Sequence, residues 1–103
     1  MSEVKAAITA IGGYVPDYVL TNKELEKMVD TTDEWIQTRT GILERRILKE
    51  KGEGASFLGE RAVNQLLEKR GIGADEIDLI ICATATPDFL FPSTACVIAD
   101  KIG

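Results

Sequence analysis

The sequence is organised around Asp30-Thr-Thr-Asp-Glu-Trp-Ile-Gln-Thr-Arg-Thr-Gly-Ile-Leu-Glu-Arg-Arg46. Thr31 followed three residues later by Glu34 is typical of a capping box, in which each side chain accepts a hydrogen bond from a backbone N–H at a helix start. Gly41 is suited to the left-handed residue that ends a helix. These signals predict a helix of about two turns, which is too short to persist in water alone and must be held by packing.

Trp35 and Arg39 are four residues apart, so both project from one face of this helix. An indole beside a guanidinium can form a slot that holds a flat aromatic ring by stacking and cation–π contact. The alternative is that Trp35 anchors a core and Arg39 is a surface charge whose stem lies along the protein, which is the common role of such pairs.

Length and composition limit the possible classes of protein. The 103 residues allow one domain at most, and no apolar run approaches the roughly 18 residues of a membrane helix. The N-terminus lacks a secretory pattern, so we expect a cytoplasmic protein with no membrane partner. Histidine is absent, and Cys82 and Cys96 do not have metal-ligand spacing, so we expect neither a zinc site nor a bound cofactor.

The net charge of −5 argues against nonspecific nucleic-acid binding. The charge is uneven, because residues 39–51 hold five basic and two acidic side chains, a local charge of +3. This cluster, which includes Arg45 and Arg46, is either a solvated face or a site for an anion, such as a cofactor phosphate or an acidic carrier protein.

Hydrophobic patterning predicts the remaining elements. Alternation predicts a strand at 4–11, and a second capping box, Thr21 to Glu24, opens a helix with Leu25, Met28 and Val29 on its apolar face. Further along we expect a short strand at 44–48, a helix at 56–69 capped by Ser56, a helical turn at 73–77, a strand at 78–86, and a final helix after Phe91-Pro-Ser93.

The strand at 78–86 decides the predicted fold class. Its centre, 79–83, is apolar without alternation, which is typical of a strand covered on both faces in a parallel sheet. Strands and helices in this order predict an α/β fold. Covering both faces needs more layers than this length supplies, so we expect the chain to be part of a larger fold.

The stretch 30–46 closely resembles the signature Asp-Thr-Ser-Asp-Glu-Trp-Ile-x-x-Arg-Thr-Gly-Ile-x-x-Arg of β-ketoacyl-acyl-carrier-protein synthase III, the initiating condensing enzyme of bacterial fatty-acid synthesis. The Thr-Asn at 21–22, the Leu-Glu-Lys-Met-Val-Asp at 25–30 and the Phe-Pro-Ser-Thr-Ala-Cys at 91–96 are similar to the same family. Leu43 departs from the pattern, since some members carry a basic residue there, and one phosphate or carrier contact is in doubt.

The resemblance implies that residues 1–103 are the N-terminal part of the first half of a layered αβαβα, thiolase-like fold. It implies that Trp35 and Arg39 sandwich the adenine of coenzyme A and that Thr31 touches the same molecule. The family's nucleophilic Cys, in an Ala-Ala-Cys-x-Gly setting, and its catalytic His and Asn have no counterpart in these residues.

Two further residues invite a functional interpretation. Cys96 lies in the first turns of a predicted helix, but it lacks a histidine base, so we expect it to be structural. Phe91 corresponds to a family residue that crosses the dimer interface and closes the partner subunit's acyl pocket. It could equally act as an aromatic staple for the helix after Pro92.

The expected function is that of an enzyme fragment. The parent, expected as a homodimer, would transfer an acyl group from acyl-CoA to its own Cys and condense it with malonyl-acyl carrier protein, while this segment alone would be inactive. Two alternatives stay open: a stand-alone binding or scaffolding subunit paired with a chain that carries the Cys, or a related enzyme such as hydroxymethylglutaryl-CoA synthase or a polyketide starter synthase.

Overall fold

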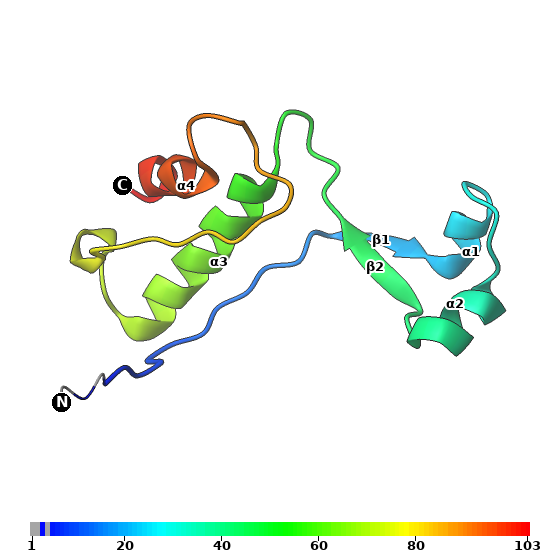
Figure 1. Cartoon of the computed structure of the whole chain (residues 1–103), viewed down its shortest axis with the longest axis horizontal. Coiled ribbons are helices and arrows are strands. Elements are labelled where there is room, and N and C mark those ends of the chain that lie inside the picture. Colours follow the sequence, from blue (N-terminus) through cyan, green and yellow to red (C-terminus); the bar gives the residue numbers. More distant parts are fainter. Residues whose placement is uncertain (1–2, 4) are drawn as a thin grey trace. The chain divides into compact units, whose positions relative to one another are not determined.

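The computed structural model describes residues 3 and 5–103, and the chain divides into two compact units. Unit 1 is the part of the chain up to Tyr14 together with Glu53–Gly103, and it contains helix α3 (Ala55–Arg70), a 3-10 turn (Ala74–Glu76) and helix α4 (Thr94–Ile102). Unit 2 is Val15–Gly52, and it contains strand β1 (Tyr18–Thr21), helices α1 (Asn22–Glu26) and α2 (Asp33–Thr40), and strand β2 (Glu44–Ile47) (Figure 1).

Unit 2 is built on an antiparallel pair of strands. β1 pairs with β2 in a register that places Tyr18 opposite Ile47 and Thr21 opposite Glu44. The predicted strand at 44–48 is therefore confirmed, whereas β1 was not predicted although its Tyr-Val-Leu-Thr composition suits a strand. Helix α1 ends at Glu26, so Met28 and Val29, at 65% and 54% exposure, were wrongly assigned to its apolar face.

Helix α2 confirms the central prediction, with one correction at its start. The backbone N–H of Trp35 donates to the Thr32 hydroxyl at 3.1 Å, so Thr32 and not Thr31 is the N-cap. Gly41 ends the helix with a φ of 72°, and its N–H donates to the Gln37 carbonyl at 2.8 Å. This left-handed backbone conformation is favourable for glycine because glycine has no Cβ.

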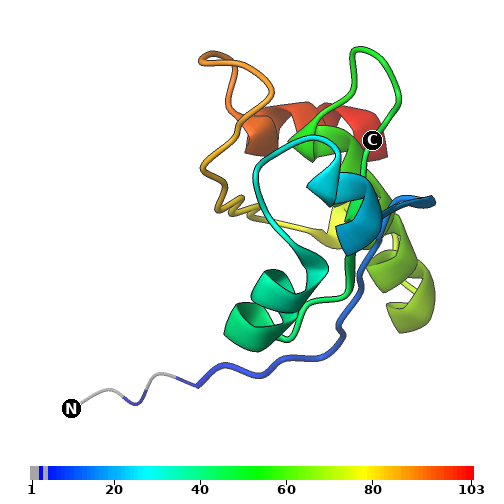
Figure 2. The same ribbon diagram turned by 90° about the vertical axis from the view of Figure 1, so that its right-hand side faces the viewer.

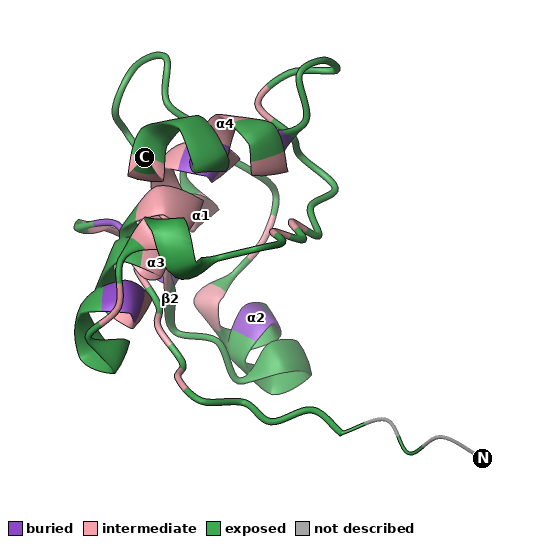
Figure 3. Ribbon diagram, turned by 90° about the vertical axis from the view of Figure 1, so that its left-hand side faces the viewer, coloured by how far each residue is buried: buried purple, intermediate pink, exposed green. Residues whose placement is uncertain are grey.

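Unit 1 is centred on the packing of α4 against α3. Ile98 of α4 and Leu67 of α3 are buried in the core, and buried positions lie on both helices (Figure 3). Gly59 permits this close approach, since a Cβ there would lie 2.6 Å from the Ile98 Cδ1. The predicted helices at 56–69 and after residue 93 are confirmed, but α3 begins at Ala55 and the Ser56 side chain does not cap it.

The predicted strand at 4–11 is wrong for residues 5–11, which form no strand, and Val4 lies outside the described residues. The end of this segment instead lies along α3. The Gly13 N–H donates to the Gln65 Oε1 at 2.8 Å, and the Lys69 Nζ donates to the Ile11 carbonyl at 3.2 Å.

The predicted strand at 78–86 is also not formed, and the sheet in the described part of the chain is the two-stranded antiparallel pair in unit 2. Leu79 and Ile81 are 75% and 84% exposed, whereas Ile80 and Cys82, which alternate with them, are partly covered. The segment keeps the period of two of a strand but has no hydrogen-bonded neighbour. No helix among the described residues is long and apolar enough to cross a membrane.

Candidate functional site

The structure brings Trp35 and Arg39 into direct contact on α2. The Arg39 Cζ lies 5.4 Å from the centroid of the Trp35 ring, within the range of a cation–π interaction. Trp35 is 55% exposed, whereas its neighbour Ile36 is the buried residue of the helix. In this chain Ile36 anchors α2, and the indole faces outward with the guanidinium beside it.

Two hollows border the Trp35 side chain. One, of about 270 Å³, is lined by Asp30, Thr31, Thr32 and Trp35, and it places Thr31 beside the indole. The other, of about 370 Å³, is lined by residues of the helix itself: Thr32, Glu34, Trp35, Thr38 and Arg39. Of the three residues singled out in the sequence, Thr31 and Arg39 therefore both lie beside the exposed ring of the third, Trp35.

The separation of Arg39 from Trp35 corrects the idea of an open slot. A flat ring between two stacking groups needs about 7 Å, which is twice a van der Waals contact of about 3.5 Å. The observed 5.4 Å is too short for that. A ligand ring must either displace the flexible Arg39 side chain or stack on indole surface that Arg39 leaves free.

The base of α2 is held by polar contacts that sequence reasoning missed. The Asp33 Oδ1 accepts hydrogen bonds from the Asn22 Nδ2 at 2.8 Å and from the Gln37 Nε2 at 2.7 Å. These donors, Asn22 foremost, hold the pKa of Asp33 below its usual value. The Asp33 backbone N–H donates to the Glu26 Oε1 at 2.6 Å, so α1 and α2 are joined at this point.

The two arginines of the predicted anion patch lie on β2, where they also support the pair of strands. The Arg45 Nη1 donates to the Leu20 carbonyl at 3.3 Å, and the Arg46 Nη1 donates to the Pro16 carbonyl at 3.0 Å. Arg45 is partly buried and Arg46 is exposed. Each guanidinium has five N–H donors, so these contacts leave others for an anion.

Phe91 lies in unit 1, in the loop that precedes α4. This loop, the orange segment in Figure 2, protrudes from the start of the helix. Phe91 is 90% exposed, and its neighbours Leu90 and Phe89 are 102% and 57% exposed. The residues that the structure describes leave Phe91 almost uncovered, so it does not act here as a staple for α4.

Asp88 ties this loop to the start of α3. Its carboxylate accepts hydrogen bonds from the Ser56 N–H at 2.9 Å and from the Ser56 hydroxyl. Its own N–H donates to the Thr94 hydroxyl at 3.4 Å. Ser56 is fully buried, and its hydroxyl, followed by its N–H, lowers the pKa of Asp88. Asp88 thus performs the capping role that the sequence suggested for Ser56.

This anchor predicts a pH-dependent first turn of α3. Because the pKa of Asp88 is lower in the folded chain, its contribution is fully present above the unfolded value of about 3.9 and is lost as pH falls through the folded pKa. Asp88→Ala should remove a cap worth about 1 kcal/mol and speed amide exchange at Ser56 about fivefold near neutral pH. Asp100→Ala, at an exposed position of α4, is the matched control. Unchanged exchange in Asp88→Ala would contradict the anchor.

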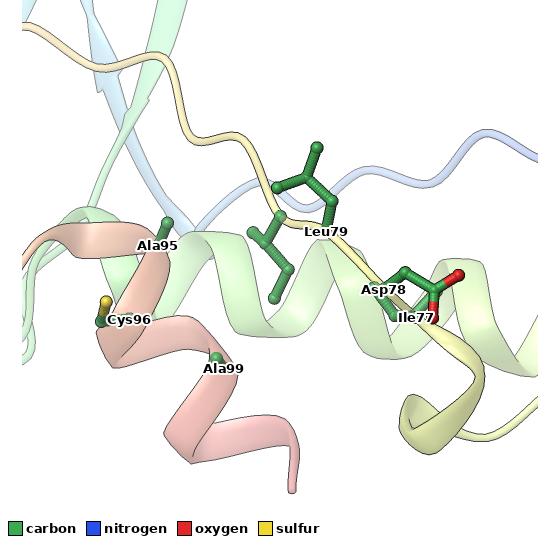
Figure 4. Close-up of a pocket in the computed structure, with 7 residues that line it drawn as sticks. Ile77, Asp78, Leu79, Ala95, Cys96 and Ala99 are labelled. Atoms are coloured by element: carbon green, nitrogen blue, oxygen red, sulfur yellow. The ribbon is translucent and has the colours of Figure 1, made fainter.

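The surroundings of Cys96 lack the groups that a nucleophile requires. Cys96 is exposed on α4, and its N–H donates to the Ser93 hydroxyl at 3.2 Å. It borders a hollow of about 300 Å³ between α4 and the segment after the 3-10 turn, lined by Ile77, Asp78, Leu79, Ile80, Ala95, Cys96 and Ala99 (Figure 4). The lining is largely apolar, and the sequence contains no histidine to act as a base.

Asn22 and Asp88 are the residues of structural consequence that the sequence did not reveal. Each is a common polar residue beside a turn or helix end, and its partners are 11 and 32 residues away. No local pattern distinguishes such a residue from an ordinary solvated one.

Comparison with known proteins shows what the chain is similar to. No family model matches the chain. The β-ketoacyl-[acyl-carrier-protein] synthase III 2 of Bacteroides thetaiotaomicron is 56% identical over all 103 residues, which span 31% of that protein. The crystal structure of 3-oxoacyl-[acyl-carrier-protein] synthase III from Aquifex aeolicus matches with a TM-score of 0.84 and 49% identity, over 90% of this chain and 30% of that one.

A third match is the priming β-ketosynthase of the R1128 polyketide biosynthetic pathway, with a TM-score of 0.83 and 38% identity over 91% of this chain and 28% of that one. The chain thus spans about three-tenths of the length of these relatives. Since the likeness covers every residue in sequence and nine-tenths of the chain in structure, the chain matches a segment of β-ketoacyl-acyl-carrier-protein synthase III and has the corresponding part of a mixed α/β, thiolase-like fold.

Proposed function

We propose that a full-length protein carrying this segment is an acyltransferase that condenses an acyl group, most readily acetyl, from acyl-CoA with malonyl-acyl carrier protein. The exposed Trp35–Arg39 pair, bordered by two hollows, carries the proposal for this segment. It is a ready surface for a flat nucleotide base, and it lies within the stretch that resembles the family signature.

In the first half of the proposed reaction, a cysteine thiolate outside this segment attacks the acyl-CoA carbonyl and coenzyme A leaves as its thiolate. In the second half, malonyl carrier protein loses CO₂, and the resulting carbanion attacks the acyl-cysteine carbonyl. A β-ketoacyl carrier protein forms and the cysteine thiolate is released. Dividing one carbon–carbon bond formation into two thioester steps is covalent catalysis.

The residues of this segment bind and orient the donor. Trp35 offers its indole to the adenine by stacking, Thr31 contributes a hydroxyl at the edge of the adjoining hollow, and Arg39 shifts from the indole to contact adenine or phosphate. Adenine stacking places the long donor molecule without touching the thioester. The interaction is therefore one of binding and orientation.

Two further roles belong to the same proposal. Arg45 and Arg46, in the segment of local charge +3, would receive phosphates or an acidic carrier protein. Phe91 would cross the interface of a homodimer and close the partner subunit's acyl pocket. Its 90% exposure in this chain is consistent with a side chain that is covered by another polypeptide.

The test is a condensation assay with a full-length protein that contains these residues. With acetyl-CoA and malonyl-acyl carrier protein, we expect CO₂ release equal to the amount of acetoacetyl carrier protein formed. Acyl-CoA hydrolysis without CO₂ release would contradict the proposal.

A priming ketosynthase of polyketide synthesis is the second candidate, because one such enzyme matches this chain with a TM-score of 0.83. It would use the same adenine surface with a different acyl group. A preference for a longer acyl donor over acetyl-CoA in the same assay would favour it.

A further inference from the structure

One buried amide connects both ends of the helix that carries Trp35 and Arg39. Asn22 is 2% exposed. Its Nδ2 donates to the Asp33 Oδ1 at 2.8 Å and to the Ile42 carbonyl at 2.8 Å. Asp33 is the first residue of α2, and Ile42 follows the glycine that ends it. The Asn22 backbone N–H adds a third tie, to the Leu43 carbonyl at 3.2 Å.

The orientation of this amide follows from its neighbours. The Asp33 carboxylate and the Ile42 carbonyl can only accept hydrogen bonds, so the NH₂ group of Asn22 must face both. Its Oδ1 is buried and has no hydrogen-bond partner within residues 3 and 5–103. A side chain of the same shape with oxygen in place of nitrogen would set acceptors against each other at both contacts.

Helix α2 depends on such hydrogen bonds from outside the helix more than most helices do. It has eight residues, and Ile36 is its buried side chain, so little apolar packing fixes its position. A helix of this length does not persist without external contacts. The hydrogen bonds of Asn22 reach Asp33, Ile42 and Leu43 and not Trp35 or Arg39, so Asn22 acts on that pair by fixing the helix that carries both.

We propose that Asn22 is the positioning residue of the nucleotide surface: by joining the first residue of α2 to the carbonyl beyond its last turn, it fixes the helix in the orientation that presents Trp35 and Arg39. The inference rests on the proposed function and deepens it. Since only the nucleotide end of the donor meets this surface, loss of Asn22 weakens the use of CoA thioesters selectively.

The test compares two acyl donors in a full-length synthase that carries these residues. The variants are Asn22→Asp, which keeps the shape but replaces the donors with a second carboxylate facing Asp33, and Asn22→Ser, which is neutral and too short to reach both acceptors. Each should raise KM for acetyl-CoA about 5- to 10-fold, as the loss of a buried hydrogen bond implies. Each should leave KM for acetyl-pantetheine, which lacks the nucleotide, within about twofold.

Leu67→Ala is the matched control, because it empties a buried position of α3 in unit 1 without touching α2. It should destabilise the protein and affect both donors alike. Equal effects of the Asn22 variants on both donors, or failure of both variants to fold, would overturn the inference and leave Asn22 as a residue of general stability.

Trp35→Ala, assayed alongside, separates the two proposals. If Trp35→Ala is selective for acetyl-CoA and the Asn22 variants are not, the positioning role alone is overturned. If Trp35→Ala is not selective, the proposal that this surface binds adenine is wrong, and the positioning role of Asn22 is overturned as well.

Discussion

Replacing Trp35 with alanine in a full-length synthase that carries this segment should slow acylation by acetyl-CoA roughly 5- to 150-fold. This range corresponds to the 1–3 kcal/mol by which base–aromatic stacking stabilises other complexes. Acylation by acetyl-pantetheine should be nearly unchanged, because that donor has no adenine. Condensation with malonyl carrier protein should also keep most of its rate, since the arm of a carrier protein carries no adenine. The measurement is single-turnover acylation with each donor.

Ile36→Ala provides the matched control for this experiment. Ile36 is the next residue on α2, but it is buried where Trp35 is 55% exposed. Its loss should weaken the helix and slow acylation by both donors. Arg39→Ala is less clean, since Arg39 begins the basic segment and its removal could weaken carrier docking as well. If Trp35→Ala slowed acylation by both donors equally, Trp35 would act as a structural anchor. The proposal that this surface binds adenine would then be wrong.

The 103-residue chain by itself should show no acyl transfer or condensation above a blank without enzyme. It contains no histidine. Of its two cysteines, Cys82 is partly covered in the apolar segment 79–83, and Cys96 is exposed beside a largely apolar hollow. A thiol needs a base to form the thiolate and an oxyanion hole to stabilise the tetrahedral intermediate, and these are large contributions to the rate. The measurement is the release of coenzyme A and CO₂ from acetyl-CoA and malonyl carrier protein.

Cys96→Ala and Cys82→Ala are the controls, and both should match the unaltered chain. A full-length relative assayed in parallel shows that the substrates are competent. Turnover by the 103-residue chain that disappears in Cys96→Ala would contradict the structural assignment of Cys96.

The elements that depend on local chemistry could be predicted from the sequence. Helix α2 and its end at Gly41 follow from capping residues and glycine conformation. Helix α3 and the 3-10 turn were placed within one residue of their observed bounds or inside the predicted range. The contact between Trp35 and Arg39 follows from a spacing of four residues on a helix.

The site features that could not be predicted depend on partners distant in the sequence. Thr31 and Thr32 are chemically identical, and only the backbone path into α2 made Thr32 the cap. Asp88 caps α3 from 32 residues away. Arg39 and Trp35 lie too close together to leave an open slot, because of their side-chain conformations. Their spacing in the sequence does not determine these conformations.

The sequence by itself determined helices α2, α3 and α4 and the spacing that sets Trp35 beside Arg39, and its resemblance to the synthase III signature indicated the kind of protein. The tertiary structure alone decided that Asn22 joins both ends of α2 and that residues 79–83 form no strand. The physical reason is common to both. A helix satisfies its backbone hydrogen bonds within one segment, so local sequence is enough to specify it. A strand, like a bridging amide, is completed by groups elsewhere in the fold, and residues 79–83 have no such partner among the described residues.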